Sequence, residues 1–357
     1  MELLENHPLA PLTSLGLGGP AEWFVKAKTD DDIRGALQWA GDRGCDATIL
    51  GEGSNAVIAD RGIRGIVVQI GTRGLSFRED GDDLWVEAVA GESWDDLVAE
   101  TVRRNAAGME CLSGIPGSVG ATPIQNVGAY GQEVADAIAG VIAFDRESHD
   151  VVELAPEQCS FSYRNSRFKM EPRRFVVLRV LFRLRMGAPP SLRYGELLRA
   201  FDGRPSPKIA DVRRAVLSLR RSKSMLLDPS DPNGQSAGSF FTNPVLSEAG
   251  ALAAIERGRR RGLVSAEENA PTFPAGPGRT KMAAGWLIER AGFSKGLRRG
   301  PVGISTKHAL ALVHHGGGTT RALMDLAQEI QRGVQDAFGV ELQPEPVLLG
   351  FETENPG

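Results

Sequence analysis

Cysteine is scarce in this chain, with three residues among 357, and Cys45, Cys111 and Cys159 lie far apart. Their number is odd and they form no C-x-x-C pair. The sequence therefore argues against a disulfide framework and against a cysteine-based zinc site. Such sparse cysteine fits a reducing compartment, and we expect a cytoplasmic protein.

Histidine is also rare, with five residues, and three of them, His308, His314 and His315, fall close together near the C-terminus. They show neither an H-E-x-x-H pattern nor a clustered set of carboxylates, so we expect no catalytic metal. The adjacent pair before a glycine run is more typical of a strand leading into a turn.

Long apolar runs are absent. The first residues are acidic and reach Pro8 and Pro11 without an apolar segment, and no stretch approaches the 18 apolar residues of a membrane span. We expect no export signal and no anchor. An excess of one charge is missing as well, because 41 basic residues face 45 acidic ones. This balance predicts a small ligand, with no nucleic-acid and no membrane partner.

Glycine, in contrast, is abundant, with 43 residues, well above the usual ~7%. Because 41% of the residues are hydrophobic, the chain is neither disordered nor collagen-like, and we expect the extra glycines in loops. At roughly 150 residues per domain, the length predicts about two domains.

The first half alternates strands and helices. A strand is expected over 21–27, followed by a helix that Thr29 and Asp32 begin as a capping box and that ends at Gly44.

A second such pair is a strand over 84–90 and a helix that Ser93 and Asp96 are expected to cap. Residues 174–185 alternate with period two, which predicts a half-buried strand. Its arginines are interpreted as a solvated face: Arg179, Arg183 and Arg185.

Proline-rich passages near residues 187–190 and 203–207 mark the expected domain boundary, because proline interrupts both helical and strand patterns. We place the domains at 1–207 and 208–357, with the last strand a candidate to pack back on the first domain. Helices are expected at 210–221, 247–261, 281–291 and 319–338, and strands at 308–313 and 345–350. The fold class is α+β.

A first glycine loop follows a predicted strand and matches the G-x-G-x-x-G/A spacing of dinucleotide-binding turns. A Rossmann turn also needs a helix directly after it, whereas the next residues are broken by glycines and β-branched side chains. The loop can still present backbone N–H groups to an anion, and an ordinary turn explains it equally well. Its candidate binding residues are Gly51, Glu52, Gly53, Ser54 and Asn55.

A second, longer glycine loop has no helical or strand periodicity, which favours a binding role. Small residues let the backbone lie against a flat or charged ligand, and amide side chains offer donors and acceptors for a heterocycle. Two such loops suit the phosphates and ring of a dinucleotide. The candidate residues are Ser113, Gly114, Ile115, Pro116, Gly117, Ser118, Gly120, Ala121, Gln125, Asn126, Gly128, Ala129 and Tyr130.

These loops, GEGSN and GIPGSVGATPIQNVGAYG, resemble the flavin-binding segments of the UDP-N-acetylenolpyruvoylglucosamine reductase (MurB) family. Further motifs of the family follow in order along nearly the whole chain: SYRNSRFK from Ser162, RRSK from Arg220, AGSFFTNP from Ala237, KMAAGWLI from Lys281 and LQPEP from Leu342. One motif alone could be coincidence, whereas the ordered set is specific.

The resemblance implies a two-part FAD-binding domain of the vanillyl-alcohol-oxidase (PCMH) type, followed by a MurB-type C-terminal α+β substrate domain. It also implies an enzyme, UDP-N-acetylmuramate dehydrogenase. The implied reaction is reduction of UDP-N-acetylglucosamine enolpyruvate to UDP-N-acetylmuramate for peptidoglycan, with non-covalent FAD and NADPH as hydride donor. A monomer is expected.

The resemblance also implies roles for individual residues. Arg164 stabilises the charge that develops on the substrate carboxylate, Ser239 donates the proton, and Glu345 is the third catalytic residue. Outside a motif set, each has an ordinary structural explanation: an ion pair for arginine, a backbone-bonded hydroxyl for serine and a surface position for glutamate. The implied substrate contacts are Tyr163, Arg164, Tyr194, Lys223 and Asn243.

Tyr194 resembles the tyrosine of the substrate-closing loop in type I members, and Lys223 is expected to meet the diphosphate. A basic helix end is the alternative explanation for Lys223. Thr242 and Phe273 depart from residues common in the family, so polar contacts from those two positions are not carried over.

Two other functions stay open from the residues alone. A flavin oxidase acting on an alcohol would share the N-terminal fold but would not explain Ser239, Glu345 and Lys223 together. A non-catalytic nucleotide-binding protein could keep both glycine loops without needing the acid, the arginine and the carboxyl group.

Overall fold

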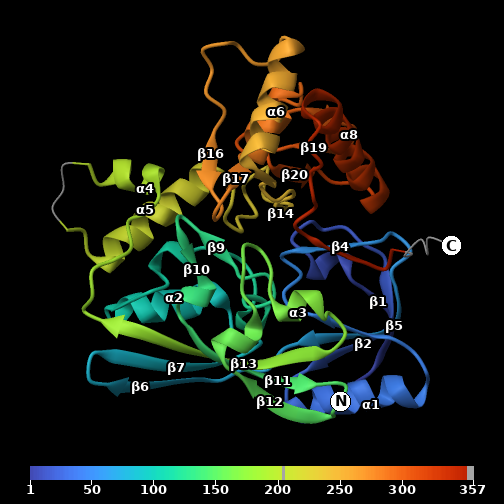
Figure 1. Cartoon of the computed structure of the whole chain (residues 1–357). Coiled ribbons are helices and arrows are strands. Elements are labelled where there is room, and N and C mark those ends of the chain that lie inside the picture. Colours follow the sequence, from blue (N-terminus) through green and yellow to red (C-terminus); the bar gives the residue numbers. More distant parts are fainter. Residues whose placement is uncertain (203–205, 352–357) are drawn as a thin grey trace. The chain divides into compact units, whose positions relative to one another are not determined.

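The computed structural model describes residues 1–202 and 206–351 (Figure 1). The chain forms two compact units that are interleaved in sequence. The first unit consists of Met1–His7, Ala21–Gly53 and Arg64–Leu226, and the second of Pro8–Pro20, Ser54–Ile63 and Leu227–Gly357. The division after Leu226 differs from the predicted boundary at 207. Residues 203–205 of the proline-rich passage lie outside the described residues.

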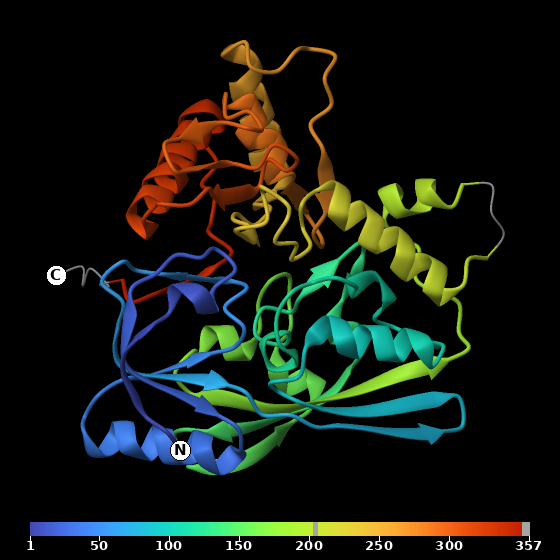
Figure 2. The same cartoon turned by 180° about the vertical axis from the view of Figure 1, so that it is seen from behind.

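One sheet of the first unit has the strand order β1-β2-β5-β3, with α1 (Asp30–Asp42) against it (Figure 2). The capping box is confirmed: Asp32 N–H donates to Thr29 Oγ1 at 3.0 Å, and Thr29 N–H donates to Asp32 Oδ2 at 3.2 Å. Gly44 follows the helix with a φ of +62°, as expected of a helix stop. The strands are β1 (Leu4–Pro8), β2 (Pro20–Ala27), β3 (Ala47–Leu50) and β5 (Ile63–Ile70).

The larger sheet of the first unit is antiparallel, in the order β12-β11-β13-β7-β6, and β8 also pairs with β13. Its long central strand, β13 (Phe175–Met186), confirms the period-two prediction. The arginine face is solvated and paired with acids: Arg183 and Arg185 contact Asp83 at 2.6 and 2.7 Å. The other strands are β6 (Leu75–Asp80), β7 (Asp83–Val89), β8 (Ala106–Ala107), β11 (Ile138–Asp145) and β12 (Asp150–Leu154).

Helix α2 (Trp94–Arg103) forms where predicted and buries Trp94 and Leu97 in the core. The predicted cap is wrong, because the Ser93 side chain makes no capping hydrogen bond. Instead, Trp94 N–H donates to Gly117 O at 2.9 Å. The second glycine loop therefore supplies the acceptor at this helix start, which a local sequence pattern cannot reveal.

The C-terminal part of the first unit is helical. Helix α5 (Ile209–Ser222) buries Val212 and Val216 in a small cluster with Leu197 of α4 (Gly195–Ala200) and Cys111. This packing explains why α5 belongs to the first unit. Short elements complete it: β9 (Gly128–Ala129), β10 (Gln132–Glu133) and α3 (Arg167–Met170).

The second unit packs three helices around short strands. Helix α8 (Thr320–Phe338) forms where predicted, buries an apolar stripe that includes Leu323, Leu326, Ile330 and Val334, and ends at Gly339 with a φ of +71°. Helices α6 (Glu248–Arg260) and α7 (Ala284–Arg290) also form. Helix α7 starts later than predicted, because β17 (Arg279–Met282) pairs with β15 (Val245–Ser247) and β16 (Thr272–Pro274).

The remaining strands form two sheets. One has the order β14-β20-β19-β18, and the other pairs β4 with β21. The strands are β4 (Ala56–Ile58), β14 (Ser236–Ser239), β18 (Arg298–Arg299), β19 (Val302–Ile304), β20 (Ala311–His314) and β21 (Val347–Leu349).

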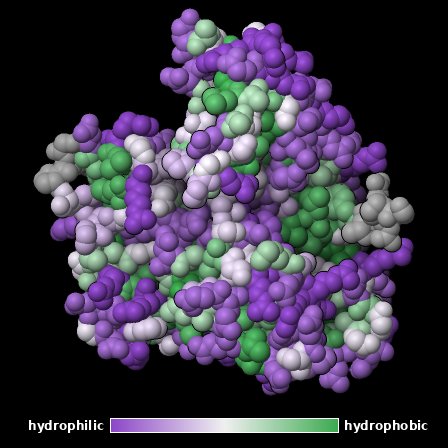
Figure 3. Space-filling model, in the orientation of Figure 1, coloured by the Kyte–Doolittle hydropathy of each residue, from purple (hydrophilic) through white to green (hydrophobic). Residues whose placement is uncertain are grey.

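The last strand, β21, runs parallel to β4, with Val347 opposite Ala56. The last strand therefore pairs with a strand from the predicted first domain, 1–207, as expected. In the structure, however, β4 belongs to the second unit. Apolar side chains gather over these strands (Figure 3), where Val347 and Leu348 are exposed. Among residues 1–202 and 206–351, no helix is both long and apolar enough to cross a membrane.

Candidate functional site

The two glycine loops lie against each other in the first unit. A Cβ added at Gly51 would lie 2.8 Å from Ser118 Oγ and 3.9 Å from the Cβ of Ala121. The Glu52 carboxyl accepts a hydrogen bond from Gly117 N–H, while partial desolvation raises the pKa of Glu52. The first loop leads into β4 rather than a helix, which confirms that it is not a Rossmann turn.

Close backbone approach explains the small residues of the second loop. Gly120 N–H donates to Ala90 O at 2.8 Å, and a Cβ at Gly120 would lie 2.5 Å from the Ala90 Cβ. A side chain at this position is therefore excluded sterically. The loop ends in β9, whose Gly128 and Ala129 pair with β10.

The Gly114 peptide is held from both sides. Gly114 N–H donates to Asp95 Oδ1 at 2.6 Å, and Arg220 Nε donates to Gly114 O at 3.1 Å. Arg213 binds both Asp95 oxygens, at 2.6 and 2.9 Å. Burial opposes ionisation of Asp95, but hydrogen bonds from Arg213 and Gly114 keep its pKa below the ordinary value. A Cβ at Gly114 would lie 2.5 Å from Leu226 Cδ2.

The amide side chain of Asn126 is used within the protein. It is 1% exposed, and its Nδ2 donates to Glu133 Oε2 at 2.7 Å and to Ser162 O at 3.1 Å. Its Oδ1 accepts from Ala135 N–H at 3.1 Å. Both amide hydrogens are therefore committed to shaping the loop, so the expected donation to a heterocycle from this side chain is not available in this arrangement.

Arg164 lies against the end of the second loop. Its Nη2 donates to Gly128 O at 2.7 Å, and its backbone has a φ of +55°. The Arg164 carbonyl accepts from Lys169 Nζ at 3.0 Å, and the guanidinium lies 5.5 Å from the Tyr163 ring centroid. The predicted catalytic arginine and the predicted cofactor loop are thus brought together within one unit.

Tyr130, Tyr194, Lys223 and Glu196 form a second cluster in the first unit. The tyrosine rings meet edge to face, 5.5 Å apart, and Lys223 Nζ lies 5.9 Å from the Tyr130 centroid. Lys223 Nζ also contacts Glu196 Oε2 at 2.5 Å. Burial raises the pKa of Tyr130 to about 12, so its phenol is neutral. The sequence predicted three of these residues and missed Glu196.

In the second unit, Ser239 and Glu345 lie on neighbouring segments. Ser239 is the last residue of β14 and pairs with Ala311 of β20. Glu345 N–H donates to Phe240 O at 2.9 Å, and Phe240 is fully buried. The structure therefore places the backbone of Glu345 beside that of Phe240, the residue that follows the predicted proton donor Ser239.

The end of the first glycine loop joins the same segment. Asn55 Nδ2 donates to Glu345 O at 3.4 Å, and Val347 N–H donates to Asn55 O at 2.9 Å. Ser54 O accepts from Ser14 Oγ at 3.2 Å. Asn55 thus fixes the backbone that carries Glu345.

Other family positions have local structural roles. Asn243 Oδ1 accepts from Ala284 N–H at 2.9 Å, at the start of α7. Thr242 Oγ1 donates to Gln343 O at 3.4 Å, and Phe273 is an exposed residue of β16. For Asn243, a substrate contact must therefore come from the Nδ2 side of the amide.

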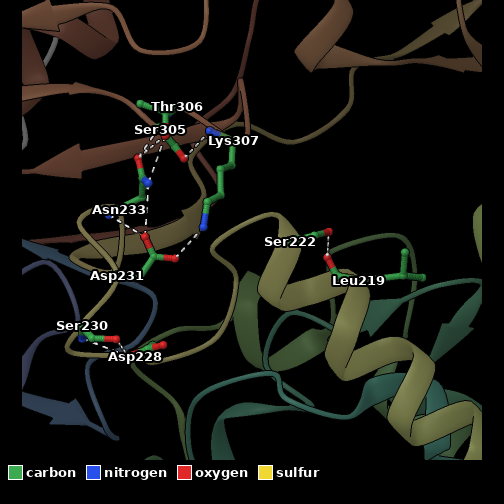
Figure 4. Close-up of polar contacts among 9 residues, drawn as sticks. All are labelled: Leu219, Ser222, Asp228, Ser230, Asp231, Asn233, Ser305, Thr306 and Lys307. Atoms are coloured by element: carbon green, nitrogen blue, oxygen red, sulfur yellow. Dashed lines mark hydrogen bonds and ion pairs between the residues drawn. The ribbon is translucent and has the colours of Figure 1, made fainter.

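A polar network orders the loop before β14 (Figure 4). Asn233 is 2% exposed, and its Oδ1 accepts from Thr306 N–H at 2.9 Å. Asp231 accepts from Asn233 N–H at 2.9 Å and contacts Lys307 Nζ at 3.2 Å. Sequence reasoning missed this network, although the turn-forming run Asp228-Pro-Ser-Asp-Pro-Asn-Gly was the available signal.

Histidine and cysteine have structural roles. His314 Nε2 accepts from Gly318 N–H at 3.0 Å, so its Nδ1 carries the proton directed at Leu15 O, 3.1 Å away.

Cys111 and Cys159 are buried free thiols, and burial raises their pKa to about 12 and about 11. In the described part of the chain, no group of three or more His, Cys, Asp or Glu residues could hold a metal ion.

Comparison with known proteins gives matches along nearly the whole chain. The FAD binding domain model matches residues 21–153, and the model for the C-terminal domain of UDP-N-acetylenolpyruvoylglucosamine reductase matches residues 228–349. The reductase of that name from Streptomyces avermitilis is 49% identical over 98% of this chain and 95% of its own length. The one from Streptomyces coelicolor is 50% identical, over 97% and 90%.

A solved structure is also similar. The crystal structure of UDP-N-acetylenolpyruvylglucosamine reductase (MurB) from Thermus caldophilus has a TM-score of 0.66, 24% identity and 98% coverage of both chains. At this level of identity, the match supports the fold.

Proposed function

The chain belongs to the UDP-N-acetylenolpyruvoylglucosamine reductase family, and we propose that Arg164, Ser239 and Glu345 are its catalytic residues. It is an FAD-dependent enzyme that uses NADPH to reduce UDP-N-acetylglucosamine enolpyruvate to UDP-N-acetylmuramate in peptidoglycan precursor synthesis. The matches also confirm the predicted α+β fold class. The backbone hydrogen bond between Glu345 and Phe240, the residue next to Ser239, is the observation that supports the catalytic assignment most directly.

The glycine loops of the first unit fit FAD. At Gly51 and Gly120, a Cβ would lie too close to Ser118 and Ala90, so glycine lets these segments pack closely. Gly53 and Gly117 have φ values of +63° and +124°, backbone conformations that glycine adopts without strain. We assign the pyrophosphate and ring of FAD to these two loops.

FAD, when bound, supplies the hydride chemistry that links NADPH to the enolpyruvyl double bond. Addition of hydride to the terminal carbon leaves negative charge on the neighbouring carbon and its carboxylate. We assign Arg164 to that carboxylate, because a guanidinium is permanently charged and offers planar paired donors. The hydrogen bond from Arg164 Nη2 to Gly128 O holds the guanidinium at the cofactor loop.

Ser239 completes the reduction by donating its hydroxyl proton to that neighbouring carbon. Serine is a weak acid, so the transfer requires surroundings that stabilise the resulting alkoxide. Glu345 is assigned to polarise the substrate carboxylate as a protonated or hydrogen-bonded carboxyl group. Arg164 belongs to the first unit, and Ser239 and Glu345 belong to the second.

The general test is anaerobic spectroscopy. Addition of NADPH should bleach the flavin, and addition of the enolpyruvyl substrate should restore its colour. A flavin oxidase would recover colour with oxygen and an alcohol rather than with this substrate. In a non-catalytic nucleotide-binding protein, NADPH followed by the enolpyruvyl substrate would not bleach the flavin and restore its colour. The behaviour of an oxidase or of a non-catalytic protein would overturn the assignment.

The FAD should be released completely by acid precipitation. Covalent attachment needs a reactive side chain near the ring. The glycine loops contain no histidine, while the thiol of Cys111 is buried and donates to Ser191 O at 3.2 Å. We therefore expect all yellow colour in the supernatant, and colour in the washed pellet would contradict the prediction.

Lys223→Ala and Tyr194→Phe should raise KM for the UDP-sugar more than they lower kcat. We assign both residues to the UDP end, where binding contributes equally in ground and transition states. Reduction of the flavin by NADPH should change little. Lys295→Ala, which removes a surface lysine paired with Glu289 at 3.5 Å, is the matched control. An unchanged KM for the UDP-sugar in both test variants would contradict the assignment of the diphosphate to this cluster.

Other expectations stay predictions. They are a monomeric, cytoplasmic protein without nucleic-acid or membrane partners, and substrate contacts from Tyr163 and Asn243.

A further inference from the structure

The ion pair between Lys223 and Glu196 occupies a position assigned above to the substrate diphosphate. Lys223 Nζ and Glu196 Oε2 lie 2.5 Å apart, and the two side chains are only 28% and 31% exposed. Partial removal from water makes such a pair stronger than one on an open surface. An internal carboxylate therefore already neutralises the ammonium group that would bind an anionic ligand.

Glu196 is held in this position by the packing of its helix. Next to it, Leu197 is fully buried with Val212 and Val216 of α5. The preceding segment is fixed too, because Ser191 N–H donates to Glu110 Oε1 at 2.8 Å. The fold thus fixes the backbone of Glu196 in a position from which its side chain reaches Lys223.

Two tyrosines, Tyr130 and Tyr194, lie beside the ion pair of Lys223 and Glu196. Tyr194 is the residue before α4 and meets the Tyr130 ring edge to face at 5.5 Å, and Lys223 Nζ lies 5.9 Å from that ring. The Glu196 charge also acts on Tyr130 and raises the pKa of its phenol, after the larger effect of burial. The carboxylate therefore belongs to the same cluster as the predicted UDP-binding side chains Tyr194 and Lys223.

A diphosphate that binds Lys223 must compete with this carboxylate. The ligand carries more negative charge than Glu196, so exchange is favourable, but it has to break the existing pair and meets the repulsion of a nearby carboxylate. A neutral ligand gains nothing from the exchange. The carboxylate therefore lowers affinity selectively for ligands that carry the diphosphate.

We propose that Glu196 is an internal competitor for Lys223, which sets the affinity for the diphosphate of the substrate and is displaced from the lysine when that diphosphate binds. This inference rests on the proposed function, because it takes Lys223 to be the diphosphate ligand. It assigns to Glu196 a role in specificity rather than in hydride or proton transfer.

The test is calorimetric titration of FAD-loaded enzyme with UDP, and with uridine as a probe that lacks the phosphates. Glu196→Gln keeps the side-chain shape and removes the charge, so UDP should bind about tenfold more tightly, the scale expected for one charge pair. Uridine binding should not change. Glu289→Gln, which removes a carboxylate paired with Lys295, is the control for net charge and should change neither affinity.

Equal or weaker UDP binding by Glu196→Gln would overturn the inference, because Glu196 would then be positioning Lys223 or serving only the fold. Glu196→Ala provides a second variant with the same expected direction. Thermal unfolding and the flavin spectrum establish that each variant is folded.

Lys223→Met separates this inference from the function on which it rests. It should weaken UDP binding and leave uridine binding unchanged. Adding Glu196→Gln to it should tighten UDP binding less than Glu196→Gln does alone, because only the repulsion between the carboxylate and the diphosphate is then removed. If Lys223→Met does not affect UDP, the assignment of Lys223 fails. If it weakens UDP while Glu196→Gln does not tighten it, only the competitor role fails.

Discussion

Ser239→Ala is expected to slow reoxidation of the reduced flavin by the enolpyruvyl substrate by ~10² to 10⁴-fold, the usual effect of losing a general acid. Reduction of the flavin by NADPH should stay near the rate of the unmodified enzyme, because no proton from Ser239 is needed there. The backbone pairing of Ser239 with Ala311 does not involve the hydroxyl, so the strand should survive the substitution.

Anaerobic stopped-flow spectroscopy measures the two half-reactions separately. Ser236→Ala is the matched control, since Ser236 is another serine of β14 and its hydroxyl accepts from Gly238 N–H at 3.4 Å. The control should leave both rates nearly unchanged. Equal losses in both half-reactions of Ser239→Ala would show that the hydroxyl maintains the fold rather than donating a proton.

Arg164→Met should slow the same reoxidation step by ~10² to 10³-fold, the scale of removing one group that stabilises developing negative charge. It should also weaken FAD binding, because the guanidinium donates to Gly128 O at 2.7 Å in the second glycine loop. Arg164→Lys retains the charge but loses the planar pair of donors, so it should recover only part of the rate.

Rates for these variants must be measured at saturating FAD, so that loss of cofactor is not mistaken for loss of catalysis. Arg179→Met is a suitable control, because Arg179 is paired with Asp30 at 2.9 Å on the solvated face of β13. A normal reoxidation rate in FAD-saturated Arg164→Met would restrict Arg164 to a structural role in the loop.

Elements with strong local signals were predictable from the sequence. Helix α1 carries a complete capping box, α8 carries a long apolar stripe and a terminal glycine, and burial in β13 alternates from Leu178 to Arg185. In these elements, propensity, pattern and burial all favour the same structure. The short strands β14 and β19 were missed, because three or four residues are too few to show a period.

Tertiary contacts account for the other differences. At the start of α2, the Trp94 N–H donates to Gly117 O, and the Ser93 side chain makes no capping hydrogen bond. The apolar stripe of α5 predicts a helix but does not reveal which unit the helix will join. Similarly, the sequence identified Asn126 as a polar loop residue but could not show that Glu133 and Ser162 occupy its donors. Glu196 lies in no recognisable sequence motif, and only its ion pair with Lys223 in the structure identifies it as part of the cluster.

The pairing of β21 with β4 affects the order in which the parts of a newly synthesised chain can fold. All segments of the first unit, through Leu226, are synthesised before most of the second, so that unit can fold while translation continues. The β4–β21 sheet must wait for Val347–Leu349, although its other strand was made near the start. Glu345, just before β21, is fixed at the same moment. A nascent chain can therefore form the long second glycine loop, which lies in the first unit, before it fixes Asn55 of the first loop and the proposed catalytic carboxyl group of Glu345.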